Sequence, residues 1–366
     1  MIERIFVDNF RCFVNFEWKP SQLALLLGEN GSGKTSIAEV LWGLRALIAE
    51  GSEVRRWFPA SSRTLWDKRL EQRFELDVRI EGAPYSYSLL LEHDPEDSKQ
   101  TWVKQEALRQ DTTVLLAYSD GKLDLYSDDG DWFRGLPTNR GRSGLGVVAP
   151  DNSFKKLLRF KQWFSEGIWY FRPDARAMES RTDLQTEWLE PNLRNFAAWY
   201  PSLIARDLEA AIRVKSSLAE SIPGFDTLGV DKQGSHLQMR FKAGKSPGYA
   251  VDFRDISDGQ RALSALYVLR HAVLQPGRLV IFDEPDNYVA LREIQPWIME
   301  IIDVALTTGG PQVWFVSHHP ELLNSLAPNY GTRFFRHDDG PARVEPFKGV
   351  PGLTASEVVA RGWTDE

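Results

Sequence analysis

The chain has 366 residues, of which 42% are hydrophobic and 26% are charged, and its formal net charge is −7 at pH 7. The length predicts about two domains, and the composition is typical of a soluble globular protein. It excludes a disordered chain, a collagen-like repeat and a bundle of membrane helices. The acidic balance argues against a surface that binds nucleic acid or anionic lipid everywhere, although a local basic patch remains compatible with it.

The single cysteine, Cys12, excludes an intrachain disulfide and a cysteine-based zinc site. The N-terminal segment alternates apolar and charged residues, whereas a signal peptide needs an unbroken apolar core. The longest apolar runs, such as 23–27, are far shorter than the ~20 residues that span a bilayer. We therefore expect a cytoplasmic protein with no membrane segment.

Residues 1–150 are expected to form an N-terminal lobe. Alternating and apolar runs predict strands at 2–7, 13–18 and 22–27, and then a glycine loop and a helix over 37–48. Turn signals from 72 to 133 separate further short runs, which predict an antiparallel β subdomain with strands at 74–80, 85–91, 102–108, 113–117 and 123–126. Residues 135–152 are expected to form an exposed loop.

Residues 151–250 are expected to form a helical and stranded middle segment. A helix is predicted over 154–164 with Ser153 as its N-cap, followed by a short strand at 168–171. Amphipathic helices are predicted over 193–199 and 203–218. Strand patterns follow at 227–230, 237–241 and 249–253.

Residues 251–366 are expected to form a C-terminal lobe in which strands and helices alternate, a pattern that predicts a parallel sheet. The predicted elements are a helix over 261–273, a strand at 279–282, a helix over 294–306, a strand at 313–316 and a helix over 320–326. No internal repeat and no long heptad pattern is present. The fold class expected is therefore α/β, with a mixed or parallel sheet and an antiparallel β subdomain.

The first motif, at residues 28–35, is a complete G-x-x-x-x-G-K-[ST] between a predicted strand and a predicted helix, the context that a phosphate-binding loop requires. Its glycines let backbone N–H groups turn toward phosphate oxygens, and the helix adds its positive dipole end. Lys34 is expected to contact the β and γ phosphates, and Thr35 to bind Mg²⁺. The alternative is a plain glycine-rich turn. The residues expected to bind nucleotide are Glu29, Asn30, Gly31, Ser32, Gly33, Lys34, Thr35 and Ser36.

The second motif is a four-residue apolar run that ends in Asp283 and Glu284. Ligands bind at the C-terminal edge of strands in open α/β sheets, so both carboxylates are placed for chemistry. Asp283 is expected to hold Mg²⁺ through water, and Glu284 to deprotonate an attacking water. A strand end with two solvated acids is the alternative.

Two further segments have both a structural and a functional interpretation. Ser257 stands at the start of a predicted helix and is a good N-cap, but with Gly259 and Gln260 it could also bind the γ-phosphate of a second subunit. His318 and His319 follow a predicted strand. A histidine N–H can donate to a phosphate oxygen, although loop histidines are usually only exposed.

Together these segments resemble an ATP-binding-cassette-type ATPase head of the branch that contains RecF, the SMC proteins and the standalone OLD-like ATPases. The resemblance includes the segment 9–13, which precedes the glycine loop. It covers nearly the whole chain, although residues of about 150–250 match only loosely. It implies ATP and Mg²⁺ as ligands. It also implies that Lys34 and Thr35 are the Walker A pair, Asp283 the Walker B aspartate, Glu284 the catalytic base and His318 the switch histidine, with His319 the weaker candidate.

The resemblance identifies residues 28–35 as the P-loop and residues 256–261 as the family's signature segment. One P-loop and one signature segment per chain imply a head-to-tail homodimer with two ATP molecules between its subunits, since in this family Ser257, Gly259 and Gln260 act in trans. The sequence departs from the family pattern at two positions and leaves one family residue unassigned. Asp258 places an acid beside the expected phosphate, Ala290 stands where an aspartate is common, and the Q-loop glutamine is not assigned, with Gln162 and Gln185 as candidates.

The resemblance suggests an ATPase subunit of a prokaryotic anti-phage or DNA-surveillance system. Only residues 319–366 follow the switch histidine, so the nuclease effector is expected to be a separate protein. A RecF-like repair ATPase is the first alternative, and it would bind DNA through a basic patch that includes Lys155, Lys156, Arg159, Lys161, Arg140 and Arg142. The second is a nucleotide-gated scaffold with little turnover.

Overall fold

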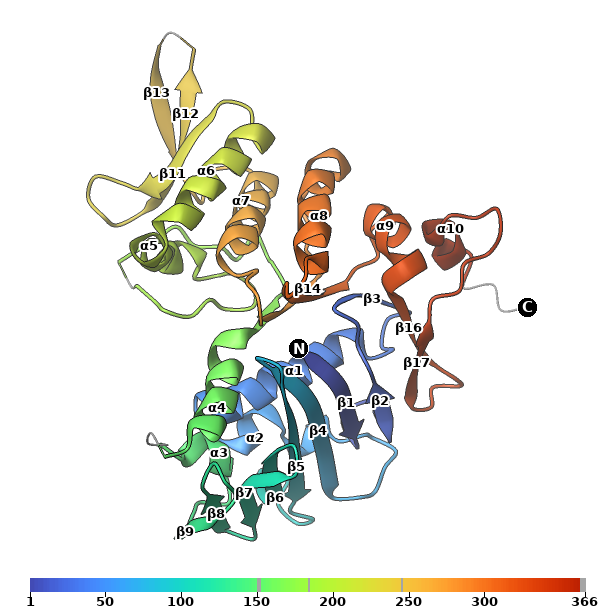
Figure 1. Ribbon diagram of the computed structural model, residues 1–366. Coiled ribbons are helices and arrows are strands. Elements are labelled where there is room, and N and C mark those ends of the chain that lie inside the picture. The colour runs from blue at the N-terminus through green and yellow to red at the C-terminus, as the bar shows by residue number, and fades with distance from the viewer. Residues whose placement is uncertain (150–152, 184, 245, 363–366) are drawn as a thin grey trace. The chain divides into compact units, whose positions relative to one another are not determined.

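The computed structural model describes residues 1–149, 153–183, 185–244 and 246–362 (Figure 1). The chain divides into two compact units. Unit 1 comprises Met1–Trp169, Gly277–Leu279 and Ala327–Lys348. Unit 2 comprises Tyr170–Pro276, Val280–Leu326 and Gly349–Glu366. In the described part of the chain, no helix has the length and apolar character needed to cross a membrane.

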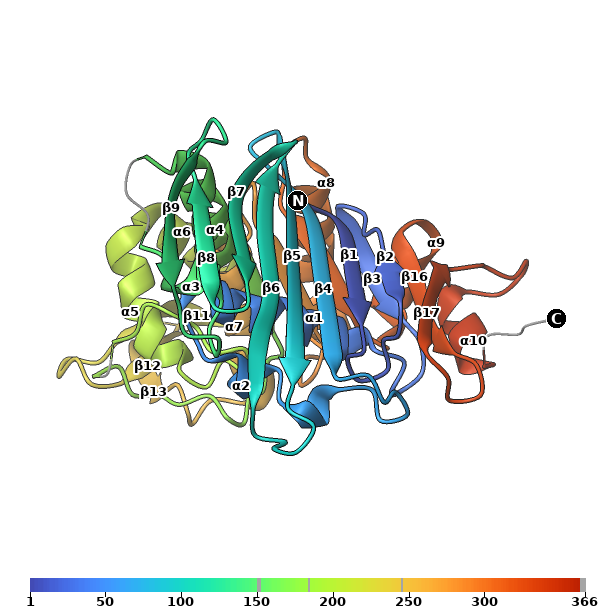
Figure 2. The ribbon, with the colours of Figure 1, turned by 90° about the horizontal axis from the view of Figure 1, so that it is seen from below.

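Unit 1 contains an eight-stranded antiparallel sheet in the order β2-β1-β4-β5-β6-β7-β8-β9, with β4 to β7 side by side in Figure 2. Its strands are β1 (Ile2–Asp8), β2 (Phe16–Trp18), β4 (Glu71–Ile80), β5 (Ala83–His93), β6 (Thr101–Gln110), β7 (Thr113–Ser119), β8 (Lys122–Tyr126) and β9 (Trp132–Pro137). Two hairpins turn at Glu81-Gly82 and Asp120-Gly121, where both residues have positive φ, as tight two-residue turns require. The predicted antiparallel subdomain is confirmed.

One face of this sheet is covered by helices. They are α1 (Lys34–Ala49), α2 (Val54–Trp57), α3 (Gly144–Val147) and α4 (Lys155–Gly167), with a 3₁₀ turn at Ala60–Ser62. Along β4, buried and more exposed residues alternate, as expected for a strand with one face on a core. Phe160 of α4 packs against Tyr85 and Tyr87 of β5, with ring centroids 5.6 and 5.7 Å apart.

Three strands of unit 1 bring distant parts of the sequence together. β3 (Leu23–Leu27) pairs in parallel with β16 (Gly331–Arg336), with Leu25 opposite Gly331, and β16 pairs antiparallel with β17 (Ala342–Pro346). All five residues of β3 are buried. A continuous apolar strand is what a position inside a mixed sheet requires, and the predicted mixed α/β class is confirmed.

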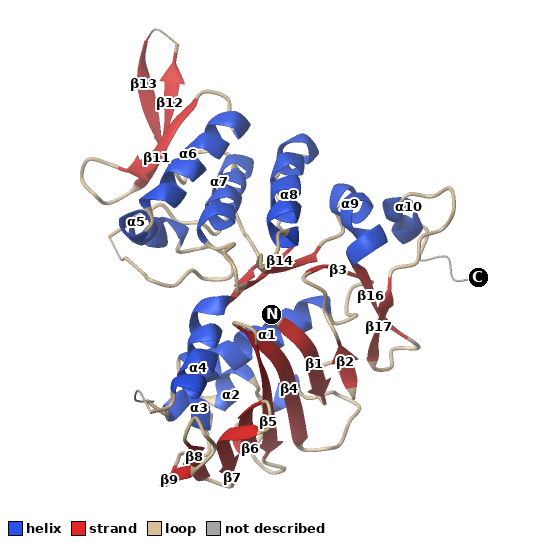
Figure 3. Cartoon of the chain, in the orientation of Figure 1, coloured by secondary structure: helices blue, strands red, loops and turns tan. Residues whose placement is uncertain are grey.

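Unit 2 is rich in helices, as Figure 3 shows. α6 packs against α5, α7 and β11, and β11, β12 and β13 form an antiparallel sheet. The elements that lie wholly or partly in unit 2 are β10 (Ile168–Phe171), α5 (Phe196–Arg206), α6 (Leu208–Ser221), β11 (Phe225–Val230), β12 (Leu237–Ala243), β13 (Ser246–Asp252), α7 (Asp258–Ala272), β14 (Leu279–Asp283), α8 (Leu291–Leu306), β15 (Gln312–Val316), α9 (Pro320–Tyr330) and α10 (Ala355–Ala360).

Several sequence-based boundaries are wrong. The strand expected at 13–18 is only β2, because the chain turns at Asn15, whose φ is 48°. The helix expected over 203–218 is two helices separated at Asp207, whose carboxylate accepts the N–H of Ala210 and caps α6. The Asp207 side chain thus starts a new helix where periodicity alone suggested continuity.

The predicted exposed loop at 135–152 is correct for residues 138–142 but wrong for 135–137 and 143–148, and residues 150–152 lie outside the described residues. It contains the end of β9 and the short helix α3, which Ser143 caps from a fully buried position. The buried carboxylate of Glu106 accepts hydrogen bonds from the Ser143 hydroxyl and the Gly144 N–H, both at 2.6 Å. Ser153 is not the N-cap of α4, because Asp128 accepts the first-turn N–H groups of that helix.

Candidate active site

The glycine loop of unit 1 joins β3 to α1, as the motif requires. Gly28 has φ 138°, and a Cβ added there would lie 2.0 Å from the backbone oxygen of Phe334 on β16. Gly33 has φ 107°, and its Cβ would lie 2.8 Å from the ring of Phe13. Gly28 and Gly33 are therefore required for two reasons. A side chain at either position would collide with a neighbouring atom, and both residues have a positive φ that other residues rarely adopt.

The groups in this loop fit a phosphate. The N-cap of α1 is Gly33, no side chain caps the helix, and its first turn holds no acidic residue. Ser32 is 3% exposed, and its Oγ has no hydrogen-bond partner in the described part of the chain. Uncapped first-turn N–H groups and an unpaired buried hydroxyl are what an anion at a helix N-terminus would satisfy.

Lys34 is 7% exposed, and its Nζ donates to the backbone oxygens of Gly28 and Glu29 at 2.6 and 2.9 Å. The ammonium thus lies against the loop that precedes it. Thr35 is half-buried, and Ser36 is buried and accepts a hydrogen bond from Arg11 at 3.2 Å. The exposed residues of the loop are Glu29, Asn30 and Gly31.

Unit 2 places the two predicted carboxylates at the end of β14. Asp283 is 1% exposed, and its Oδ2 accepts a hydrogen bond from the hydroxyl of Tyr170 at 3.0 Å. A buried carboxylate needs such a partner. Tyr170 stands in the predicted strand 168–171, but its partner is 113 residues away in sequence, and no local signal marks it.

Glu284 has φ 53°, an uncommon conformation for a residue other than glycine. Its N–H donates to the backbone oxygen of Val316 at the end of β15 (2.7 Å), and its Oε2 accepts from Asn287 at 3.1 Å. Left-handed residues held by their surroundings cluster at functional sites. The hydrogen bond from Glu284 to Val316 therefore places Glu284 and the residues after Val316 together at the C-terminal ends of β14 and β15, as the two strand-end motifs predict.

The two histidines after β15 differ in their surroundings. His319 donates its backbone N–H to the Ser317 hydroxyl at 2.9 Å, and its Nδ1 accepts the N–H of Glu321 at 3.3 Å. Ser317 in turn donates to Asp286 at 2.6 Å, which ties this segment to the residues after Glu284. His319 is thus engaged with the start of α9, whereas His318 is exposed.

The signature segment opens α7. Ser257 is its N-cap, and its Oγ accepts the N–H of Gln260 at 3.2 Å, while Gln260 Oε1 accepts the N–H of Ser257 at 3.4 Å. This reciprocal pair is a capping box, so the structural interpretation of Ser257 is correct. The cap uses the hydroxyl as an acceptor, so its proton can still be donated to a ligand. A Cβ on Gly259 would lie 2.9 Å from the backbone oxygen of Tyr288.

The remaining candidates have local roles. Gln162 is exposed on α4 and contacts Glu166, Gln185 is exposed in a loop, and Ala290 is the N-cap position of α8 without a side-chain cap. Among the described residues, no group of three or more His, Cys, Asp and Glu side chains could by itself hold a metal ion.

The predicted basic patch is largely paired with protein groups. Arg159 forms an ion pair with Glu81, and Arg140 forms one with Asp120. Lys161 Nζ donates to the backbone oxygen of Val148 at 2.8 Å, and burial lowers the pKa of this amine. These contacts reduce the positive charge that the patch offers to DNA.

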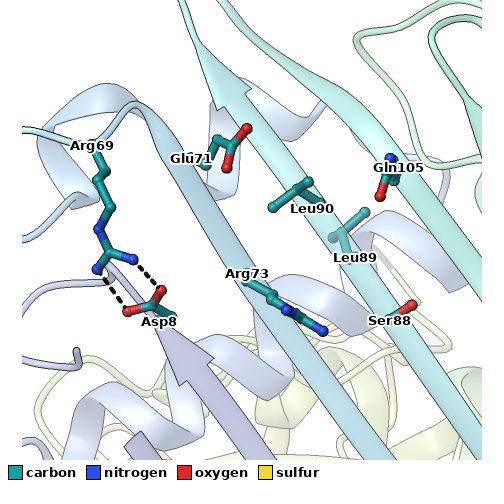
Figure 4. A pocket seen from close by; sticks show the side chains of 8 residues that line it. All are labelled: Asp8, Arg69, Glu71, Arg73, Ser88, Leu89, Leu90 and Gln105. Atoms are coloured by element: carbon teal, nitrogen blue, oxygen red, sulfur yellow. Dashed lines mark hydrogen bonds and ion pairs between the residues drawn. The ribbon is translucent and has the colours of Figure 1, made fainter. Parts of the chain in front are cut away.

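A cavity of about 320 Å³ lies on the eight-stranded sheet of unit 1 (Figure 4). Arg69 and Asp8 at its rim form a two-pronged ion pair, with N–O distances of 2.7 and 3.0 Å. Its lining residues are Asp8, Arg69, Glu71, Arg73, Ser88, Leu89, Leu90 and Gln105. None of the predicted site residues is among them, so this cavity is separate from the motifs described above.

Comparisons with known proteins agree with the geometry. The family model described as "AAA domain, putative AbiEii toxin, Type IV TA system" matches residues 23–324. A crystal structure of the SMC head bound to the C-terminal winged-helix domain of ScpA has TM-score 0.55 and 15% identity, and the match covers 95% of this chain and 98% of that one. The Smc head domain with a coiled coil and joint from Pyrococcus yayanosii has TM-score 0.50 and 11% identity, with 98% and 99% covered. No curated protein matches the sequence significantly.

Proposed function

The chain belongs to the AAA-domain family described as putative AbiEii toxin of type IV TA systems, and from this membership we propose that it is the ATP-driven switch of a two-component system. It is an ATPase with the fold of an SMC head. The observation that best supports the switch is the glycine loop, where close approach at Gly28 and Gly33, an uncapped helix start and the orphaned Ser32 hydroxyl all suit a phosphate.

We propose that ATP is bound by residues 29–36 and that Lys34 neutralises its β and γ phosphates. Glu284 accepts a proton from water as the water oxygen bonds to the γ-phosphorus. The bond from that phosphorus to the oxygen bridging to the β-phosphate then breaks, and ADP and phosphate are released. His318 donates an N–H to the γ-phosphate.

Mg²⁺ belongs to this proposal as the ion held by Thr35 and Asp283. Both offer hard oxygen donors, and Mg²⁺ commonly binds through one or two protein groups together with substrate phosphates. When bound, it supplies positive charge to the phosphate oxygens. The buried position of Asp283 and its bond to Tyr170 support a fixed carboxylate for that task.

The switch works as a head-to-tail homodimer in our proposal. The chain carries one glycine loop and one signature, so two copies related by a twofold axis provide two complete sites. Ser257, Gly259 and Gln260 of one copy contact the γ-phosphate bound by the other. ATP binding closes the dimer, and hydrolysis opens it.

We propose that the effector is a separate prokaryotic protein, such as a nuclease, in anti-phage defence or DNA surveillance. The family description, which refers to toxin–antitoxin systems, supports a two-component arrangement. The pairing of Arg140, Arg159 and Lys161 with protein groups gives less support to the RecF-like alternative.

ATP turnover measured with and without duplex DNA tests the proposal, with Lys34→Ala as the inactive control. We expect turnover that Lys34→Ala abolishes and that DNA alone does not stimulate. Stimulation by DNA with a steep salt dependence would favour the repair alternative, and absence of turnover under all conditions would favour the scaffold. Co-purification of the chain with the products of neighbouring genes, in the presence of ATP, identifies the effector.

A further inference from the structure

The acid in the signature segment is the feature that the sequence leaves unexplained. Asp258 lies between Ser257 and Gly259, the two residues proposed to meet a phosphate of the second copy. A carboxylate there would repel that phosphate unless it is compensated. Its compensation is therefore what decides whether the segment can bind an anion.

Asp258 is first of all the counter-charge of Arg261. The Arg261 side chain is only 10% exposed, and its Nη2 forms an ion pair with Asp258. The Nε of Arg261 has no hydrogen-bond partner within the described residues. A buried guanidinium with no counter-charge is strongly unfavourable, so Asp258 is required by the fold of α7.

A second arginine reaches the same carboxylate from a distant part of the sequence. The Nε of Arg176 lies 3.3 Å from Asp258 Oδ2, and its side chain is 76% exposed. Its Cζ lies 5.6 Å from the ring centroid of Tyr288, which is close enough for a cation–π contact. Among the described residues, the bond from Nε is the only hydrogen bond that the Arg176 side chain donates, so Nη1 and Nη2 remain available as hydrogen-bond donors.

The turn that carries Arg176 is itself anchored. The Oδ1 of Asp174 accepts the backbone N–H of Arg176 and the hydroxyl of Tyr288, both at 3.1 Å. The guanidinium is thus held at Nε by Asp258 and on one face by Tyr288. With two carboxylates and two guanidinium groups the cluster is neutral, and loss of Arg176 would leave one net negative charge beside Ser257 and Gly259.

We propose that Arg176 is a further phosphate-binding residue, whose Nη groups contact the phosphates of the nucleotide held by a second copy of this chain. The inference rests on the proposed function, because it needs the ATP-closed dimer. Asp258 then has two tasks, since it balances the buried Arg261 and positions Arg176. A planar guanidinium with two unused N–H-bearing ends is well suited to phosphate oxygens.

The dissociation constant of the ATP-bound dimer tests this role, measured by analytical ultracentrifugation in a Glu284→Gln background. We expect Arg176→Met to weaken the dimer at least tenfold, and Arg176→Lys, which keeps the charge but not the planar guanidinium, to weaken it clearly less than Arg176→Met. The control is Arg194→Ala, which removes an arginine of similar exposure that pairs with Glu179 at 2.7 Å and should change nothing. Binding of a fluorescent ATP analogue to the monomer should be the same in all variants, because residues 28–36 are unchanged.

The outcomes separate the two proposals. If the Glu284→Gln parent does not dimerise in ATP, the proposed function is wrong and the role of Arg176 is wrong with it. If the parent dimerises and Arg176→Met dimerises equally well, only the role of Arg176 is wrong. A purely structural role is indicated if Arg176→Lys is as weak as Arg176→Met, and that result also overturns the inference.

Discussion

Replacing Tyr170 with phenylalanine tests how the buried carboxylate of Asp283 is stabilised. The substitution removes one oxygen atom and keeps the ring. That oxygen donates to Asp283 Oδ2 at 3.0 Å, with Asp283 1% and Tyr170 6% exposed. A hydrogen bond to a charged group contributes about 1.5–3 kcal/mol, and at this depth water does not easily replace the lost donor. We expect Tyr170→Phe to lower the free energy of unfolding by about that amount.

Urea unfolding at pH 7 measures this loss, with Tyr249→Phe as the control. Tyr249 is 57% exposed, so its variant should differ from the parent by less than about 0.5 kcal/mol. In an Asp283→Asn background the acceptor is neutral, and the cost of Tyr170→Phe should fall by about half. Equal stability of parent and Tyr170→Phe, or an unchanged cost in the Asp283→Asn background, would refute the reasoning.

Three other predictions follow from the geometry. Gly28→Ala should abolish ATP binding, because its Cβ would lie 2.0 Å from the Phe334 oxygen. The control is Gly82→Ala in the β4–β5 hairpin, where φ is also positive and a Cβ would meet no atom within 4 Å; it should bind ATP normally and lower the free energy of unfolding by only about 1 kcal/mol. Equal ATP binding by the two variants, measured by calorimetry, would contradict this. Burial lowers the pKa of His93 to about 4, below its ordinary 6.5, so between these two pH values the unfolded chain binds a proton that the folded chain does not. The free energy of unfolding should therefore be unaffected by His93 above pH 6.5 and should fall by up to about 3 kcal/mol as the pH drops to 4. Urea unfolding at a series of pH values should show a smaller loss of stability in His93→Gln than in the parent, and an equal loss would exclude this cause. The pKa of His271 is also lowered to about 4 by burial, so part of the loss should persist in His93→Gln. Asn287→Ala should lower kcat about two- to tenfold and leave the KM for ATP unchanged, because Asn287 orients Glu284 at 3.1 Å; a change confined to KM would show that Asn287 acts on binding instead.

Local patterns in the sequence predict most strands of unit 1 well. Alternating burial and the turn residues Glu81-Gly82 and Asp120-Gly121 fix the hairpins, and both signals lie within a few residues. The errors arise where the deciding partner is distant. Asp128 caps α4 from 27 residues away, and the buried Glu106 orders α3 from 38 residues away. No window of the sequence contains both partners.

In the candidate site, too, the residues with a local sequence signal are predicted, and those whose partner is distant in sequence are not. Strand-end motifs place Asp283, Glu284 and His318 at the C-terminal ends of β14 and β15, as expected from apolar runs followed by polar residues. Tyr170 and Arg176 were not predicted, because their partners Asp283 and Asp258 are 113 and 82 residues away. From the sequence alone, Asp258 is an acid beside the expected phosphate. Its two arginine partners explain why an acid is tolerated there.

The central claim is an ATP-gated dimer that Glu284 reopens by hydrolysis. The mass of Glu284→Gln in solution, measured by light scattering after size exclusion with and without Mg²⁺-ATP, tests it most directly. We expect a monomer of 41.7 kDa without nucleotide and a dimer with ATP, and no dimer when Lys34→Ala is added. A Glu284→Gln variant that stays monomeric in ATP and hydrolyses it at the parental rate would contradict the account.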